Sequence, residues 1–221
     1  MLIPGHRSFP SLPPVPQEIL DGFREAQVAI VSDNMNRLYG TRSLRPVHGK
    51  ARLIGTAVTV KTRPGDNMTL HKTYALLRAG DVLVIDGGGD LNQALVGEIM
   101  MRRAQAIGVA GFVIDGAIRD VAAFVESEFP CFARGITHRG PYKSGPGEIN
   151  VPVSIDGLVV MPGDLVLGDE DGVITFDRAV AADLLPLVTA QQAREAEALR
   201  AAREGRPSSY IGVAAEKGQL A

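Results

Sequence analysis

Arg119 and Asp120 are the neighbouring side chains in this sequence that are best suited to chemistry. They follow the apolar run GFVIDGAI, near the carboxyl end of an expected parallel strand, where open α/β sheets bind their ligands. An Arg guanidinium matches a carboxylate, and an adjacent Asp offers oxygen to a hard cation such as Mg²⁺. The pair therefore suggests a site for an acid and a metal, although spacing alone fits a surface pair at a helix start more often.

A second candidate site lies at Gly97–Met100, with the sequence GEIM. If one helix spans residues 91–107, Gly97 is an interior glycine and costs about 1 kcal/mol against Ala. If the helix instead begins near Gly97, its first N–H groups lack partners and can bind an anion. The sequence leaves both helix starts open.

Other kinds of catalytic site find little support. There is no GxSxG, HExxH, Walker or GxGxxG motif. The four histidines lack the spacing of zinc ligands, and His71 is expected to be a surface or packing residue. Cys131, in the apolar run PCFA, is expected to be a small buried hydrophobe.

The elements that must position these residues alternate in type. Strands are expected at residues 81–85, 110–114 and 130–133, with helices before Gly108 and up to about Ser127. The first strand, VLVI, is apolar throughout, as in a strand that is covered on both faces. The DGGGD stretch that follows it is expected to be a loop. This order predicts a βαβαβ unit of parallel strands joined by right-handed crossovers.

The rest of the chain flanks this unit. Alternating β-branched residues predict a strand at 50–62, Asp66 is expected to cap a helix over 67–78, and Ser32 or Asp33 is expected to cap an earlier helix. The remaining segments are a Pro-rich extended arm at 1–16, a Gly/Pro loop at 135–150, a β meander at 151–176, a helix at 177–204 and a tail at 206–221. We expect a single α/β domain over 17–205.

Composition excludes several classes of protein. The 221 residues have a formal net charge of −2 and no Trp, so neither a nucleic-acid-binding field nor a base-stacking platform is expected. A single Cys excludes an intramolecular disulfide framework. No stretch approaches the roughly 18 apolar residues of a membrane span, and no signal peptide is visible. We therefore expect a cytoplasmic protein with neither nucleic-acid nor membrane partners.

Several motifs together resemble a known family. They are GGGDLNQALVGEIMMRRAQAIGVAGFVIDGAIRDVAAF, FPCFARGITHRGP, GPGEINVPV and GLVVMPGDLVLGDEDGVITF. This combination, over roughly residues 33–195, is similar to ribonuclease activity regulator A and to the class II 4-hydroxy-4-methyl-2-oxoglutarate/4-carboxy-4-hydroxy-2-oxoadipate aldolases. The resemblance implies a swivelling β/β/α fold and a homotrimer or homohexamer with sites at the subunit boundary.

The resemblance also implies roles for individual residues. Backbone amides of Gly97, Glu98, Ile99 and Met100 would bind the pyruvyl group of the substrate, Arg119 would bind substrate, and Asp120 would hold the divalent metal. The helix would then start near Gly97. One position departs from the pattern: Ala123 stands where the aldolases tend to have an acidic residue. We expect Glu98 to be the carboxylate that orders water, with Glu195 and Asp33 from a neighbouring subunit as weaker candidates.

The implied reaction is cleavage of 4-hydroxy-2-oxo diacids to pyruvate and a second 2-oxo acid, with Mg²⁺ or Mn²⁺ as cofactor. Decarboxylation of oxaloacetate is the expected side activity. Two alternatives stay open. One is a non-catalytic regulator that binds an RNA-degrading enzyme. The other is a related metal-dependent lyase that acts on another 2-oxo acid or a sugar acid.

Overall fold

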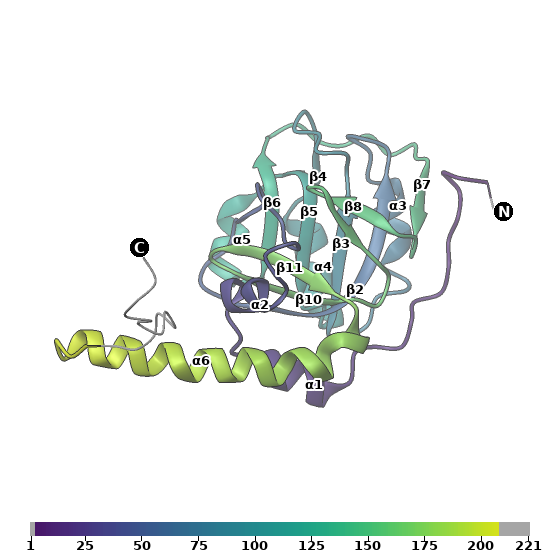
Figure 1. Ribbon diagram of the computed structural model, residues 1–221. Helices are drawn as coiled ribbons and strands as arrows, with labels where there is room; N and C mark the ends of the chain where they lie inside the picture. Colours follow the sequence, from purple (N-terminus) through teal and green to yellow (C-terminus); the bar gives the residue numbers. More distant parts are fainter. Residues whose placement is uncertain (1–2, 208–221) are drawn as a thin grey trace, which may run out of the picture.

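A nine-stranded mixed sheet forms the centre of the molecule in this computed structural model, which describes residues 3–207 (Figure 1). Its order is β1-β6-β5-β3-β2-β10-β11, while β4 pairs with β5 and β7 pairs with β2. A separate hairpin is made by β8 and β9. The strands are β1 (Arg45–Pro46), β2 (Leu53–Thr62), β3 (Asp81–Asp86), β4 (Ala94–Val96), β5 (Gly111–Ile118), β6 (Cys131–Ile136), β7 (Gly147–Ile149), β8 (Val153–Ile155), β9 (Leu158–Val160), β10 (Leu165–Asp169) and β11 (Gly172–Phe176).

Helices and the β8–β9 hairpin pack on this sheet through three clusters of buried apolar side chains. One cluster joins α3, α4 and α5 to the parallel strands, a second joins α1, α2 and α6 to β10 and β11, and a third lies under the β8–β9 hairpin. The helices are α1 (Gln17–Phe23), α2 (Val28–Asn34), α3 (Met68–Thr73), α4 (Glu98–Ile107), α5 (Val121–Ser127) and α6 (Ala181–Arg203), with a 3₁₀ turn η1 (Arg178–Val180) before α6.

The predicted parallel unit is confirmed. β3 pairs in parallel with β5, and β5 pairs in parallel with β6. Every residue of β3 is buried, as its continuous apolar run indicates. The parallel arrangement also begins earlier than predicted, because β2 pairs in parallel with β3. The carboxyl ends of these strands meet at the upper edge of the sheet in Figure 1.

Three predictions about strands need correction. β5 does not end at Ile114 but continues to Ile118, because it is paired there with both β4 and β6. The predicted loop at 135–150 contains β7, which pairs with the end of β2. The predicted meander is two separate hairpins, β8–β9 and β10–β11, because β10 pairs with β2 and joins the main sheet.

The prediction that Ser32 or Asp33 starts a helix is wrong. α2 already begins at Val28, whose N–H donates to Asp169 Oδ2 at 2.8 Å. This carboxylate comes from the β10–β11 hairpin, 141 residues away, so the helix start has no local capping signal. Asp33 instead lies in the last turn of α2 and forms an ion pair with Arg37 at 2.7 Å.

Two other helices lie where they are predicted but differ from the predictions in detail. α3 is shorter than the predicted helix over 67–78, and Asn67 rather than Asp66 directly precedes its first turn. Asp66 Oδ1 still accepts the N–H of Met68, the first residue of α3, at 2.9 Å. The sequence predicts that Pro186 kinks the last helix or starts it afresh, but α6 runs unbroken through this proline. The amino-terminal part of α6 packs on α1 and α2, whereas its carboxyl-terminal part extends beyond the body of the domain (Figure 1).

The Pro-rich arm is extended and lies along β7. Ser8 forms an isolated parallel bridge with Ile149, and Arg7 forms an ion pair with Glu148. The predicted tail at 206–221 lies outside the described residues from position 208 onward. Between residues 3 and 207, no helix combines the length and the apolar character that a membrane crossing requires.

Candidate active site

The structure decides between the two possible starts of the helix that carries Gly97. α4 begins at Glu98, with Gly97 as the residue that precedes its first turn. The preceding segment forms β4, which pairs with β5. The start of α4 is thereby fixed against the end of β5, where Arg119 N–H donates to Val96 O at 3.1 Å.

At the start of α4, two backbone N–H groups have hydrogen-bond acceptors and two do not. Glu98 N–H donates to Asp120 Oδ2 at 3.0 Å, and Met100 N–H donates to Gly97 O at 3.1 Å. Within residues 3–207, the N–H groups of Gly97 and Ile99 have no hydrogen-bond acceptor. Unpaired donors at the positive end of a helix dipole form a binding site for an anion such as a carboxylate.

Arg119 and Asp120 lie directly beside this helix start. Asp120 has a left-handed backbone (φ 59°, ψ 38°), which costs free energy for a non-glycine residue and is often found at functional sites. Arg119 Nε lies 3.6 Å from Asp120 Oδ2, and both side chains are a little under half exposed. Asp120 Oδ1 has no hydrogen-bond partner in the part of the chain that the structure describes.

Gly97 is required sterically at this site. A Cβ atom at this position would lie 2.4 Å from Asp120 Oδ2 and 3.0 Å from Arg119 Cγ. The backbone of Gly97 is extended (φ −151°), so conformational strain is not the reason for glycine. The glycine is needed because the helix start and the Arg119-Asp120 pair approach each other without room for a side chain.

These groups line a cavity of about 130 Å³. Drug-sized ligands occupy sites of about 300–1,000 Å³, so the cavity suits a small acid or one part of a larger one. Gly97, Ile99, Met100, Arg119 and Asp120 are among its lining residues, and so are three residues that sequence reasoning did not select: Asn67, His71 and Lys143. The structure thus brings five of the six predicted site residues together around one space, and Glu98 is the exception.

Asn67 and His71 come from the start of α3. Asn67 Nδ2 donates to Leu95 O at 3.0 Å, while its Oδ1 is buried without a hydrogen-bond partner. Burial lowers the pKa of His71, and the charges of Lys143 and Arg103 lower it further. Asn67 and His71 are four positions apart, and residues at this spacing share a helix face. This spacing, directly after Asp66, is the signal in the sequence that could have identified both residues.

Glu98 takes part through its backbone rather than its side chain. Its carboxylate pairs with Arg102 Nε at 3.3 Å on the outer face of α4, and it is not among the lining residues. The prediction that this carboxylate orders a water stays untested. Ala123, the departure from the aldolase pattern, is buried in the core beside Phe124.

The residues at the cavity suit a hard divalent cation that keeps most of its water. No group of three or more His, Cys, Asp or Glu side chains gathers as a metal site within residues 3–207. Mg²⁺ usually keeps several waters and takes only one or two protein carboxylates. Asp120, with its unpartnered Oδ1, meets that requirement and is the carboxylate among the lining residues.

The two weaker carboxylate candidates lie together elsewhere on the chain. Gln191 Nε2 donates to Asp33 Oδ2 at 3.2 Å and to Glu195 Oε1 at 2.9 Å. Neither carboxylate lines the cavity that contains Asp120. Within one chain, therefore, they are not part of the candidate active site.

The two Asp-Gly strand ends of the central unit have a structural role. Asp115 accepts Arg134 Nε at 2.5 Å and the N–H of Asp156 at 2.9 Å. Asp86 accepts Lys61 Nζ at 3.0 Å. Asp156 itself accepts Arg134 Nη2 at 3.1 Å, so Arg134 and its two carboxylates hold the β8–β9 hairpin against the sheet edge.

The sequence and the fold also resemble those of known proteins. A family model described as "RraA-like: Aldolase/RraA" matches residues 28–175. A putative 4-hydroxy-4-methyl-2-oxoglutarate aldolase from Halalkalibacterium halodurans is 37% identical over 188 residues, which are 85% of this chain and 87% of that protein. A 4-hydroxy-4-methyl-2-oxoglutarate aldolase from Thermus thermophilus is 38% identical over 126 residues, 57% of this chain and 76% of the relative.

A solved structure supports the same relationship. The RNA-processing inhibitor RraA from Thermus thermophilus superposes with a TM-score of 0.64 at 34% identity, covering 69% of this chain and 93% of that structure. The names of these relatives include both an enzyme and an inhibitor. The region matched by the family model contains β2 to β10 and all the residues that line the cavity. The chain therefore belongs to the RraA-like (Aldolase/RraA) family.

Proposed function

We propose that this protein is a divalent-metal-dependent aldolase that cleaves 4-hydroxy-2-oxo diacids, such as 4-hydroxy-4-methyl-2-oxoglutarate, to pyruvate and a second 2-oxo acid. The observation that carries the proposal is the convergence of two unpaired N–H groups, Arg119 and Asp120 on one small cavity. The two relatives named as 4-hydroxy-4-methyl-2-oxoglutarate aldolases support the same reaction. Decarboxylation of oxaloacetate is the expected side activity, because it also yields pyruvate.

The chain's own residues would bind the pyruvyl end of the substrate. The N–H groups of Gly97 and Ile99 would donate to its carboxylate, at the positive end of the α4 dipole. The Arg119 guanidinium would face the keto oxygen and stabilise the negative charge that develops there as the carbon–carbon bond breaks. Asn67 Oδ1, buried without a partner, would accept a hydrogen bond from a hydroxyl group or a bound water.

Asp120 would hold the metal through Oδ1, while its Oδ2 stays bound to the Glu98 N–H. When bound, Mg²⁺ or Mn²⁺ would supply Lewis-acid polarisation of the 2-oxo acid. The base that takes the proton from the 4-hydroxyl has two candidates in this chain. His71 lines the cavity and its lowered pKa keeps the imidazole neutral near pH 7, whereas Glu98 would have to leave Arg102.

The test is pyruvate release from 4-hydroxy-4-methyl-2-oxoglutarate and from oxaloacetate, with Mg²⁺ or Mn²⁺ and with a chelator. We expect turnover that needs metal and that Asp120→Asn abolishes. Asn accepts the left-handed backbone at position 120 and can still receive the Glu98 N–H, so the variant should fold like the parent. Asp171→Asn, in an exposed turn, is the matched control. A parent protein that releases no pyruvate from either acid with metal present would refute the proposal.

A second candidate function is inhibition of an RNA-processing enzyme without catalysis. It is favoured by the likeness to the structure named as the inhibitor RraA. On that hypothesis, the protein binds its enzyme partner equally well with and without Asp120→Asn, and no 2-oxo acid is cleaved. A panel of other 2-oxo acids and sugar acids would detect a related lyase.

A further inference from the structure

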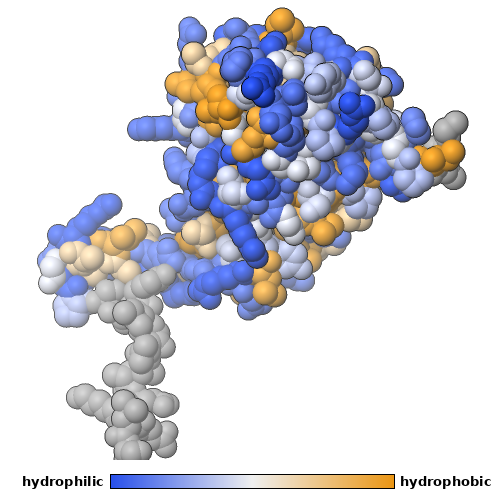
Figure 2. Space-filling view, turned by 90° about the horizontal axis from the view of Figure 1, so that it is seen from above, coloured by the Kyte–Doolittle hydropathy of each residue, from blue (hydrophilic) through white to orange (hydrophobic). Residues whose placement is uncertain are grey.

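The loop between β6 and β7, residues 137–146, forms part of the wall of the candidate active site. It runs along the upper edge of the sheet (Figure 1), and Figure 2, which is seen from above, shows a mostly hydrophilic surface with hydrophobic patches. Pro141 and Lys143 of this loop line the cavity, and a Cβ atom at Gly140 would lie 3.2 Å from Arg119 Nη1. Lys143 therefore adds a positive charge to the cavity that contains Arg119.

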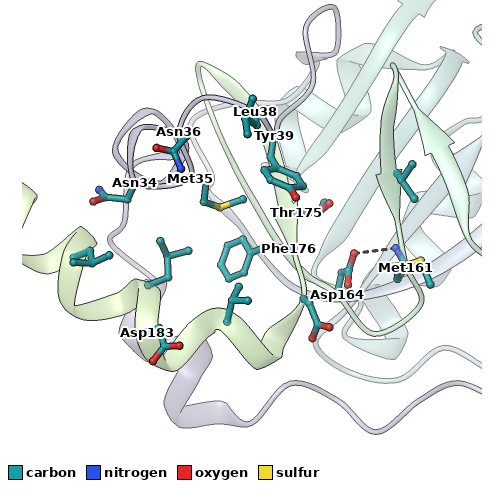
Figure 3. Close-up of a pocket in the computed structure, with 15 residues that line it drawn as sticks. Asn34, Met35, Asn36, Leu38, Tyr39, Met161, Asp164, Thr175, Phe176 and Asp183 are labelled. Atoms are coloured by element: carbon teal, nitrogen blue, oxygen red, sulfur yellow. Dashed lines mark hydrogen bonds between the residues drawn. The ribbon is translucent and has the colours of Figure 1, made fainter.

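A larger groove elsewhere on the molecule does not suit the proposed substrate. It has a volume of about 740 Å³ and lies on the side formed by α2, α6 and the β8–β9 hairpin (Figure 3). Within the described part of the chain, its lining residues include Asp164, Asp177 and Asp183 and no Lys, Arg or His. Carboxylates without a basic side chain beside them repel a diacid. The residues that place positive charge around the smaller cavity are therefore the ones that matter for this substrate.

Backbone hydrogen bonds fix the first part of the β6–β7 loop beside Arg119. Thr137 N–H donates to Ile118 O at 2.9 Å, and Ala94 N–H donates to Arg139 O at 2.8 Å. Ile118 is the last residue of β5, and Ala94 is the first residue of β4. The first part of the loop is thus held by the same two strands that fix the start of α4.

One buried carboxylate holds the last part of the loop. Asp66 is 0% exposed. Its Oδ2 accepts the N–H groups of Ser144 at 2.7 Å and Gly145 at 2.9 Å, and its Oδ1 accepts the N–H of Met68 at 2.9 Å. Burial would raise the pKa of Asp66, but these hydrogen bonds and the charge of Arg63 outweigh it and hold the pKa below its usual value. The carboxylate is therefore charged and accepts three backbone donors at once.

These hydrogen bonds join the two segments that complete the cavity. Met68 is the first residue of α3, and Asn67 and His71 reach the cavity from this end of the helix. The backbone makes a parallel connection, because Asn67 N–H donates to Tyr142 O at 3.0 Å. Lys143 follows Tyr142 directly in the chain. The positions of Lys143 and of the side chains from α3 are therefore set together, at the contact between the loop and the start of α3.

We propose that Asp66 is a positioning residue for the proposed reaction, because it clamps the β6–β7 loop onto the start of α3 and so holds Lys143 and His71 at the cavity. Asp66 is not among the lining residues, so it acts through the residues that it holds. The inference rests on the proposed function, since the cavity is the proposed site of pyruvate release. Without the clamp, the charge of Lys143 would leave a cavity that must bind a diacid.

The first test is the pKa of His71, measured by NMR with Mg²⁺ present in the parent and in Asp66→Asn. Burial lowers the pKa of His71, and the charges of Lys143 and Arg103 lower it further. Release of the loop takes Lys143 away and should raise this pKa. Removal of the negative charge of Asp66 would by itself lower it, so a rise reports movement of the loop. Lys143→Gln removes the charge but keeps the clamp, and therefore calibrates the size of the rise.

The second test is kcat/KM for pyruvate release with saturating Mg²⁺. We expect Asp66→Asn to lower it about 100-fold, since misplacement by about 1 Å can cost 10²-fold in rate. Ser144→Pro should change both measurements in the same direction, because Pro lacks the N–H that Asp66 Oδ2 accepts. Its position is exposed, so this variant tests the clamp even if Asp66→Asn does not fold.

Asp169→Asn is the matched control. Asp169 is a buried carboxylate that accepts the N–H groups of Val28 and Asp171, and none of these three residues lines the cavity. This variant loses the same kind of contact as Asp66→Asn, so it accounts for any general loss of stability. We expect it to leave the pKa of His71 and kcat/KM unchanged.

Two results would overturn the proposal. One is an unchanged pKa of His71 in both Asp66→Asn and Ser144→Pro. The other is an equal loss of kcat/KM in Asp169→Asn, because that loss would reflect stability alone. A parent protein that releases no pyruvate, together with a raised pKa of His71 in both variants, would refute the proposed function and support the clamp.

Discussion

At the scale of single residues, Gly97 connects the two halves of the candidate site. It leaves an unpaired N–H at the helix start and also leaves the room that Asp120 and Arg119 occupy. Its importance is visible neither in its backbone angles nor in its neighbours along the chain. It follows from the approach of residues more than 20 positions away.

Gly97→Ala is expected to reduce kcat/KM for pyruvate release by about 100-fold. The new methyl group would lie 2.4 Å from Asp120 Oδ2 and must push the carboxylate away, and misplacement by about 1 Å can cost 10²-fold in rate. Steady-state kinetics with saturating Mg²⁺ checks this. Gly49→Ala is the control, because its Cβ would meet only the flexible end of Glu128, 3.3 Å away. Unchanged kinetics in Gly97→Ala would contradict the close approach.

At the scale of elements, Asp156 links the turn of the β8–β9 hairpin to the segment before β1 and to β6. Arg42 and Ser43 donate their N–H groups to Oδ2 of this carboxylate, and Arg134 and the Ser43 hydroxyl donate to Oδ1. Burial would raise the pKa of Asp156, but these hydrogen bonds and the charge of Arg134 outweigh it and lower the pKa to about 2. The charged form is therefore the one that the folded state stabilises.

Asp156→Asn is expected to destabilise the protein by about 3 kcal/mol, because it breaks a largely buried ion pair and leaves Arg134 with less negative charge. For a chain of this size that corresponds to a fall in Tm of roughly 6 to 12 °C. Asp171→Asn is the control, since Asp171 also precedes a glycine in a hairpin turn but is exposed. Equal melting temperatures for the two variants would contradict the role of Asp156.

The same carboxylate predicts a dependence on pH. Its folded-state pKa is about 2, whereas an unfolded Asp titrates near 3.9. The stabilisation is therefore fully present above about pH 4 and is lost as the pH falls toward 2. Acid unfolding followed by circular dichroism should show a shallower loss of stability between pH 4 and 2 in Asp156→Asn than in the parent. Parallel curves would exclude this contribution.

At the scale of the whole molecule, binding at the cavity should stabilise the folded state. A ligand at 100 times its Kd contributes about 2.7 kcal/mol, which for a chain of this size raises Tm by roughly 5 to 11 °C. Pyruvate with Mg²⁺ should produce this shift in the parent and not in Asp120→Asn. Calorimetry measures it without turnover. An equal shift in both proteins would place the ligand away from Asp120.

Much of this molecule is determined by the sequence alone. The apolar runs at 81–85, 110–114 and 130–133 predict the parallel strands correctly, because burial on both faces requires continuous apolar residues. The hydrogen bond from the Met68 N–H to Asp66 is likewise a local effect, since the two residues are only two positions apart. Such features depend only on neighbours along the chain. The resemblance in motifs was sufficient to identify the family, which the family model confirms.

The tertiary structure alone decided the rest, because the atoms concerned come from distant parts of the chain. α2 starts at Val28 because a carboxylate 141 residues away receives its N–H. The start of α4 at Glu98 agrees with the resemblance, but the residues alone left it open, and the pairing of β4 with β5 fixes it. The side chain of Glu98 turns out to face Arg102 rather than the cavity, while Asn67 and His71 reach the cavity from α3. The spacing of residues along the sequence does not specify such contacts, because they are set by how helices and strands pack across the sheet.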